Sequence, residues 1–115
     1  METFRQLTRR RAQLLEEIAA LGPMRRGSVC DHYLPVRRKD GSTARRGPYP
    51  TYTFKQGGKT RGRHLPGEQE AVLYRQQIAT FRRFQELTAQ LAQVGQQLAD
   101  LEAAGQDEGK KNSRR

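Results

Sequence analysis

The chain has 115 residues, with 22 Lys and Arg side chains against 12 Asp and Glu, so its formal charge at pH 7 is +10. This length accommodates one domain. The hydrophobic fraction of 34%, with no Trp, excludes a large core, and no apolar run is long enough to span a membrane.

The first helix is predicted over residues 2–21. Its apolar side chains recur at spacings of three and four residues, which is typical of one buried helix face. These side chains are Phe4, Leu7, Leu14, Ile18 and Leu21. Gly22-Pro23 then ends the helix, because proline cannot continue it.

A basic β insert is predicted over residues 27–65. Residues 28–34 alternate weakly, as in a strand, whereas residues 35–47 are basic and short of apolar side chains, which predicts a loop. Two β-prone runs on either side of Gly57-Gly58 predict a β-hairpin.

A second, longer helix is predicted from residue 67 to residue 104, and residues 105–115 are predicted to be a disordered basic tail. The expected fold class is therefore α+β and mostly helical. We expect an antiparallel, coiled-coil-like helical hairpin with an inserted basic β-hairpin or small antiparallel sheet. Residues 1–104 would form a single domain.

The two predicted helices differ in length by about 15 residues, or about 22 Å. The stripe from Leu87 to Leu101 would therefore extend beyond the first helix. We expect it to bind a partner, either a second copy of the chain in a homodimer or a helix of another protein.

The basic charge is concentrated in the middle of the chain. Residues 25–64 carry eleven basic and two acidic side chains, whereas residues 65–108 carry three basic and seven acidic ones. Such asymmetry indicates an anionic partner. Guanidinium groups pair with phosphates, and aromatic rings stack on unpaired bases. The candidate nucleic-acid contacts are Arg25, Arg26, Arg37, Arg38, Lys39, Arg45, Arg46, Tyr49, Lys59, Arg61 and Arg63.

Metal binding and catalysis find little support in the residues. Cys30, the single cysteine, excludes an internal disulfide and favours a reducing cytoplasm. With His32, His64 and Asp31 it would give four ligands, at a spacing that matches no zinc knuckle. The basic region lacks the clustered carboxylates of a metal-dependent nuclease. We therefore expect no enzyme activity, no metal and no cofactor. We also expect no secretory signal, because no apolar stretch follows the first charged residues.

Two motifs carry a resemblance to a known family: LGPMRRGSV at residues 21–29 and RRGPYPTYTFKQGGKTRGRHLP at residues 45–66. Over about residues 5–100 the chain resembles small bacterial and archaeal proteins of unknown function that look like accessory proteins of mobile elements. Many relatives look as if they carry a cysteine-rich knuckle before the Gly-Pro-Tyr element. Residues 34–46 contain no cysteine here, so if a metal organises this segment in those relatives, something else must do so in this chain.

The sequence thus predicts a cytoplasmic, non-catalytic nucleic-acid-binding accessory protein that contacts phosphates through a cationic β-hairpin and loop. The alternative is a protein–protein adaptor whose long helix docks on a recombinase, transposase or other effector. The residues leave DNA and RNA equally open.

Overall fold

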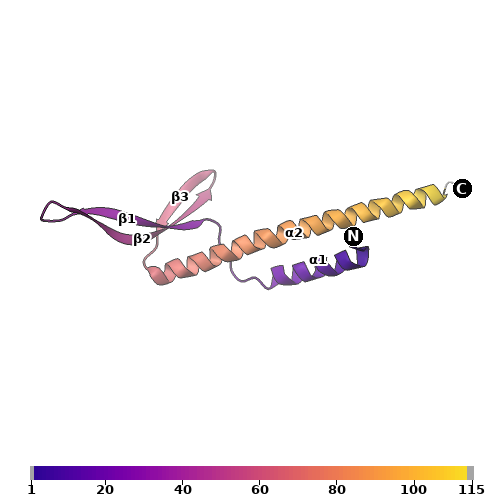
Figure 1. Cartoon of the computed structure of the whole chain (residues 1–115), viewed down its shortest axis with the longest axis horizontal. Helices are drawn as coiled ribbons and strands as arrows, with labels where there is room; N and C mark the ends of the chain where they lie inside the picture. The colour runs from indigo at the N-terminus through magenta and orange to yellow at the C-terminus, as the bar shows by residue number, and fades with distance from the viewer. Residues whose placement is uncertain (1, 114–115) are drawn as a thin grey trace. The chain divides into compact units, whose positions relative to one another are not determined.

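A computed structural model shows two helices and a three-stranded antiparallel sheet (Figure 1). It describes the backbone of residues 2–113 and the side chains of residues 2–105. The elements are α1 (Phe4–Ala19), β1 (Ser28–Arg37), β2 (Thr43–Gln56), β3 (Lys59–His64) and α2 (Glu68–Ser113). About half of the chain is helical, so the predicted α+β class with a small antiparallel sheet is confirmed.

The chain divides into two compact units, and the boundary falls within α2. Unit 1 combines the chain up to Leu21 with α2 from Arg82 onward, and unit 2 spans Gly22 to Phe81. The grouping of residues 1–104 into one domain stays a prediction.

In unit 1, α1 runs antiparallel to α2. Leu7, near the start of α1, lines a hollow with Leu101, whereas Glu17, near its end, lies 3.9 Å from the guanidinium of Arg83. A capping box begins α1: the Gln6 N–H donates to the Thr3 hydroxyl, and the Thr3 N–H donates to the Gln6 side chain. These bonds satisfy N–H groups that have no partner within the helix.

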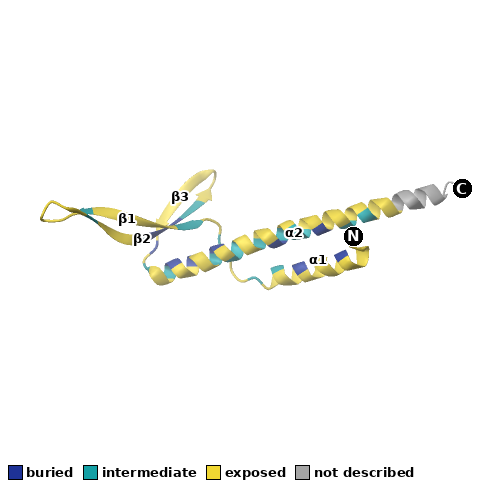
Figure 2. Cartoon of the chain, in the orientation of Figure 1, coloured by how far each residue is buried: buried dark blue, intermediate teal, exposed yellow. Residues whose placement is uncertain are grey.

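The core of unit 1 lies between these two helices. Leu7 and Leu14 of α1 pack against Leu87 and Val94 of α2, and each of the four is at most 5% exposed. Figure 2 shows buried positions in dark blue on both helices. Partly buried side chains surround this cluster: Ile18, Leu21, Leu91, Leu98 and Leu101.

The apolar stripe of α2 from Leu87 to Leu101 therefore has a partner within the chain, namely α1. The expectation of a separate partner for Leu87 to Leu101 assumed that α1 pairs with the beginning of α2. The structure contradicts this assumption. The beginning of α2 packs instead on the sheet of unit 2, through Ala71, Tyr74 and Ile78, and α1 covers the later stripe.

The sheet has the strand order β1-β2-β3. Gly57 and Gly58 have positive φ angles of 59° and 79°, and they join β2 to β3 in the predicted two-residue turn. Tyr52 of β2 and Leu65, just after β3, pack on the first turns of α2. This cluster is the core of unit 2.

Strands β1 and β2 continue past β3 as a two-stranded ribbon, residues 34–46, which we call the arm (Figure 1). The predicted loop over residues 35–47 is wrong: residues 34–37 pair with residues 43–46, and only 38–42 form the turn. None of these side chains is buried, so no apolar alternation marks the strands in the sequence. Figure 2 shows the arm almost entirely as exposed.

Helix α2 is assigned to Ser113, past residue 104 where its end was predicted. The side chains after Gly105 lie outside the described residues, and so does the disorder predicted for the tail. Within the described part, neither helix combines the length and the apolar character needed to cross a membrane.

Truncating Leu87 to Ala should destabilise unit 1 by about 2–5 kcal/mol, because the lost side chain leaves a cavity among Leu7, Leu14 and Val94. Urea unfolding followed by circular dichroism measures this change. The matched control is Leu15→Ala on α1, which removes the same atoms from a side chain that is 44% exposed. Equal losses in the two variants would contradict the assigned core.

Candidate nucleic-acid interface

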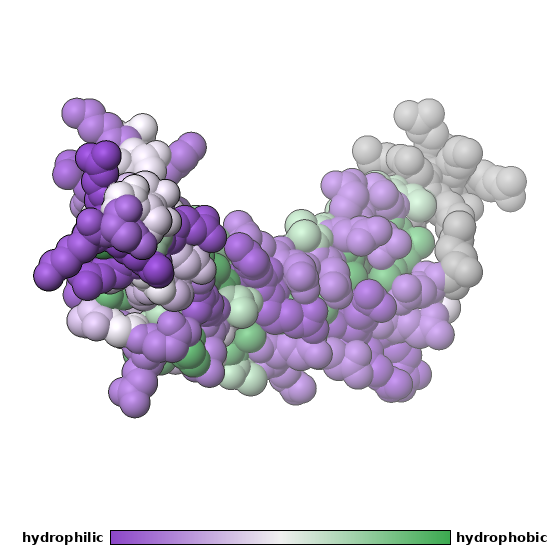
Figure 3. All heavy atoms as spheres, turned by 60° about the vertical axis from the view of Figure 1, so that its left-hand side comes forward, coloured by the Kyte–Doolittle hydropathy of each residue, from purple (hydrophilic) through white to green (hydrophobic). Residues whose placement is uncertain are grey.

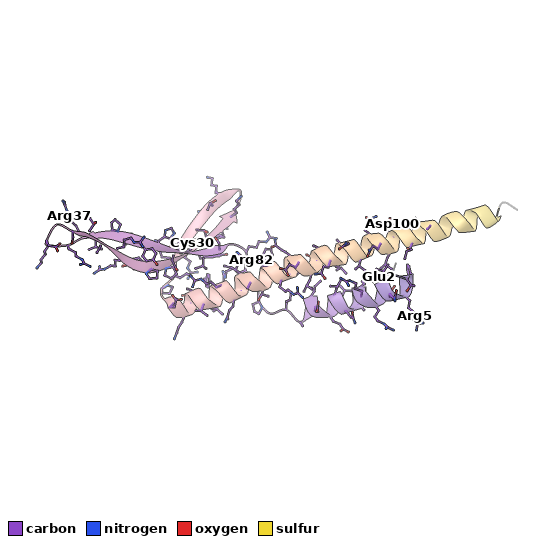
Figure 4. The ribbon with its side chains drawn as sticks, in the orientation of Figure 1. Glu2, Arg5, Cys30, Arg37, Arg82 and Asp100 are labelled. Atoms are coloured by element: carbon purple, nitrogen blue, oxygen red, sulfur yellow. The ribbon has the colours of Figure 1, made fainter. Side chains whose placement is uncertain are left out.

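The arm brings together five of the predicted contact residues, all of them exposed: Arg37, Arg38, Lys39, Arg45 and Arg46. Figure 4 places Arg37 near the tip of the ribbon. Among the described residues, none of the five forms an ion pair. Asp40 is the single acidic residue in the arm sequence. Five cations thus lie on a short ribbon with their charge largely uncompensated.

The base of the arm is marked by an irregularity in strand pairing, between His32 and Leu34. Here Gly47 has a φ of 140°, and a Cβ at this position would lie 2.8 Å from the His32 carbonyl oxygen and 3.2 Å from the Tyr33 ring. Glycine is therefore required at position 47. The Tyr33 ring in turn carries the Arg45 guanidinium 4.6 Å from its centroid, a cation–π contact that orients one arm cation.

The tip of the arm is held by Asp40. Its carboxylate accepts hydrogen bonds from the Ser42 hydroxyl at 2.6 Å and from the Ser42 N–H at 2.9 Å. These bonds, the hydroxyl first, lower the pKa of Asp40 below its ordinary value because they favour the charged form. The acidic residue within the arm therefore shapes the turn.

Arg25 and Arg26, also predicted as phosphate contacts, are engaged within unit 2. The Arg25 guanidinium lies 4.0 Å from the Tyr74 ring centroid, and its Nε donates to the Gln77 side chain at 3.0 Å. The Arg26 guanidinium lies over the Phe81 ring, and the backbone carbonyl of Arg26 accepts a hydrogen bond from the Tyr52 hydroxyl. Both residues fasten the segment before β1 to the core.

The three predicted contacts on β3 share one face, as their two-residue spacing indicates: Lys59, Arg61 and Arg63. Arg63 lies opposite Tyr52 in the register, so this face is the one that packs on α2. The Arg63 guanidinium donates to the Tyr74 hydroxyl at 3.2 Å and lies 3.9 Å from Glu70. Lys59 and Arg61 are exposed and form no ion pair among the described residues, so Arg63 is the one of the three that the structure engages with α2.

A hollow of about 310 Å³ lies where β3 ends, and the sequence analysis missed it. Tyr49, the one predicted contact residue not yet described, lines this hollow. The other lining residues are His32, Leu34, Pro50, His64 and Leu65. In Figure 3 hydrophilic atoms cover most of the visible surface, and hydrophobic ones show in small separate areas. In the sequence, Pro50 is the residue that could have indicated this hollow, because proline has no N–H to donate to a third strand.

The residues weighed as metal ligands do not form a cluster. Among the described residues, no three His, Cys, Asp or Glu side chains lie close enough to hold a metal ion. Cys30 is exposed, and the Nδ1 of His64 lies 3.1 Å from the Thr51 hydroxyl. Asp31 lies 3.1 Å from the Arg75 guanidinium.

These elements define a small α+β protein that presents a cationic two-stranded arm. A family model described as "Domain of unknown function (DUF6788)" matches residues 4–75, which cover α1, the whole sheet and the start of α2. The chain belongs to this family. No curated protein and no solved structure matches the chain.

Replacing Ser42 with Ala should raise the pKa of Asp40 toward its ordinary value, because the hydroxyl is the largest cause of its lowering. In the unaltered protein these hydrogen bonds stabilise the turn fully at a pH above the ordinary pKa of an Asp carboxyl. The stabilisation is lost as the pH falls through the lowered pKa of Asp40. Titration of the Asp40 carboxyl by NMR in both proteins measures the change. An unchanged pKa in the variant would contradict the assigned bond.

Replacing Arg25 with Ala should destabilise unit 2 by about 1–3 kcal/mol, because it removes the contact with the Tyr74 ring and the bond to Gln77. The matched control is Arg38→Ala, which removes the same charge from an exposed position in the arm. Thermal unfolding of both variants distinguishes them. Similar stabilities would contradict the structural role given to Arg25.

Proposed function

We propose that the chain is a cytoplasmic, non-catalytic nucleic-acid-binding accessory protein that contacts the phosphate backbone through the arm. The observation that supports this proposal is the exposed cluster of five arm cations with no ion pair among the described residues. An unpaired guanidinium keeps its donors for a ligand, and two parallel N–H groups match two phosphate oxygens.

The ribbon suits this task because its form does not depend on buried side chains. Backbone hydrogen bonds between residues 34–37 and 43–46 fix the strand register, and with it the positions of the cations. Every side chain of the arm can therefore be polar. A two-stranded ribbon can enter a major groove or lie along a phosphate backbone.

The mobile-element setting implied by the resemblance is part of this proposal, since the processes of such elements act on nucleic acid. The structure gives the adaptor alternative less support than the sequence alone does. It depended on an uncovered stripe from Leu87 to Leu101, and α1 packs against that stripe.

Replacing Arg37, Arg38 and Arg46 with Gln should weaken nucleic-acid binding tenfold or more at about 0.1 M salt and leave the circular dichroism spectrum unchanged. Each phosphate contact contributes about −0.9 to the slope of log K against log salt on duplex DNA. Five contacts predict a slope of about −4 to −5, and the triple variant should be shallower by about 3. Fluorescence anisotropy across a salt series measures both quantities.

The control is the triple change of Arg9, Arg10 and Arg11 to Gln on α1, which removes the same charge from exposed positions of unit 1. It should keep most of the affinity and the slope. Equal losses in the two triple variants would show that net charge, and not the arm, accounts for binding.

A further inference from the structure

The hollow beside the arm exists because β3 stops pairing at a proline. The last pair between β2 and β3 is Thr51 with His64. The next residue of β2, Pro50, has no N–H to donate, and its carbonyl accepts a bond from the Leu65 N–H at 3.0 Å as the chain leaves the sheet. Within the described residues, the edge of β2 at Tyr49 therefore has no third strand beside it.

Three aromatic rings line this hollow: His32, Tyr49 and His64. Tyr49 lies directly opposite His32 in the register, and the Thr51 hydroxyl, 3.1 Å from Nδ1, holds the His64 ring. Leu34, which is 55% exposed, extends the apolar lining. The volume of about 310 Å³ is at the lower end of the range for small-molecule sites. A flat ring with polar edges fits such a lining.

The hollow is also continuous with the arm. Leu34 lines the hollow and lies directly opposite Arg46 in the strand register. A ring in the hollow that belonged to a nucleotide would therefore have its phosphates next to an arm cation. A base in a duplex is stacked on both faces, so it reaches a hollow of this kind only when it is unpaired.

We propose that this hollow receives an unpaired base, and that the protein therefore binds single-stranded nucleic acid in preference to duplex. This inference rests on the proposed function, since the arm supplies the phosphate contacts. Tyr49 provides the stacking surface, and the His32 and His64 rings flank the base. The arm contributes affinity without regard to base pairing, and the hollow contributes the preference for single strands.

The test compares three labelled probes of about 12 nucleotides, within the usual range of single-strand sites. They are a thymidylate strand, a strand of the same length with abasic residues, and a duplex. The first two carry the same phosphates, so they differ in the bases alone. Measured by fluorescence anisotropy on the full chain, the thymidylate strand should bind about tenfold more tightly than the abasic strand, since stacking of one base supplies an effect of this size.

Two variants at one position separate stacking from shape. Tyr49→Leu keeps an apolar side chain and removes the ring, whereas Tyr49→Phe keeps the ring. The Leu variant should bind the thymidylate strand about tenfold more weakly than the Phe variant does, with no such difference on the abasic strand. Phe4→Leu is the matched control, because it makes the same change at a 52% exposed ring of α1.

The histidines give a second readout. The chain has two, and both line the hollow. Their ring C–H signals in an NMR spectrum should shift on addition of the thymidylate strand and stay in place with the abasic strand. This measurement needs no substitution, so it decides the question even where Tyr49→Leu fails to fold.

The outcomes distinguish the two proposals. Equal binding of the thymidylate and abasic strands, with both weakened by the arm substitutions, would overturn the base-binding hollow and leave the cationic interface intact. Tighter binding to duplex than to the thymidylate strand would overturn the hollow as well. Absence of binding to every probe at low salt would overturn the proposed function, and this inference with it.

Discussion

Unit 2 depends on one buried ring, that of Tyr52. It stacks on Phe54 with centroids 5.1 Å apart, meets Tyr74 of α2 edge-on at 5.1 Å, and donates its hydroxyl hydrogen to the Arg26 carbonyl. It also restricts Gly27, where φ is 115° and a Cβ would clash with the Thr53 carbonyl oxygen and lie 2.7 Å from the ring. A chain with few apolar residues must obtain its burial from a few large side chains. Here one ring joins β2, α2 and the segment before β1.

The side chains of the arm are not buried because the core of unit 2 does not extend to it. Beyond the irregularity at Tyr33, the part of the chain that the structure describes gives the two strands neither a third strand nor a helix to pack on. An isolated ribbon is marginally stable in water, so local contacts at its ends matter: the Asp40 turn at the tip and the Tyr33–Arg45 contact at the base. Charges on such a ribbon also prevent edge-to-edge association. Five cations against one acid repel a second copy of the arm, and under the proposed function the same charges attract an anionic ligand.

Sequence reasoning predicted the elements that leave a periodic or a turn signal. The apolar period of α1 and the Gly57-Gly58 turn are such signals, and the structure contains both elements. It missed the arm strands because alternation is visible only where one strand face is buried, and neither face is buried here. It also misplaced α1 along α2. The period of 3.6 residues repeats along the whole second helix, and nothing in that repeat marks which stretch packs on α1 and which on Tyr52.

The same limits explain how the predicted site divided. Charge selected ten of the eleven predicted residues, all except Tyr49. A guanidinium that packs on a ring of its own chain looks the same in a sequence as one that faces solvent. The structure separates them by their partners. Arg25 lies against Tyr74, Arg63 lies near Glu70 and Arg45 lies on Tyr33. The other four arm cations have neither a ring nor an acidic partner among the described residues: Arg37, Arg38, Lys39 and Arg46. The first kind contributes to folding, and its removal would weaken the core whatever the ligand. The second kind contributes nothing to the described core. Residues of the second kind can therefore change ligand affinity without changing the fold, and this separation is what makes the arm a site that can be tested independently of stability.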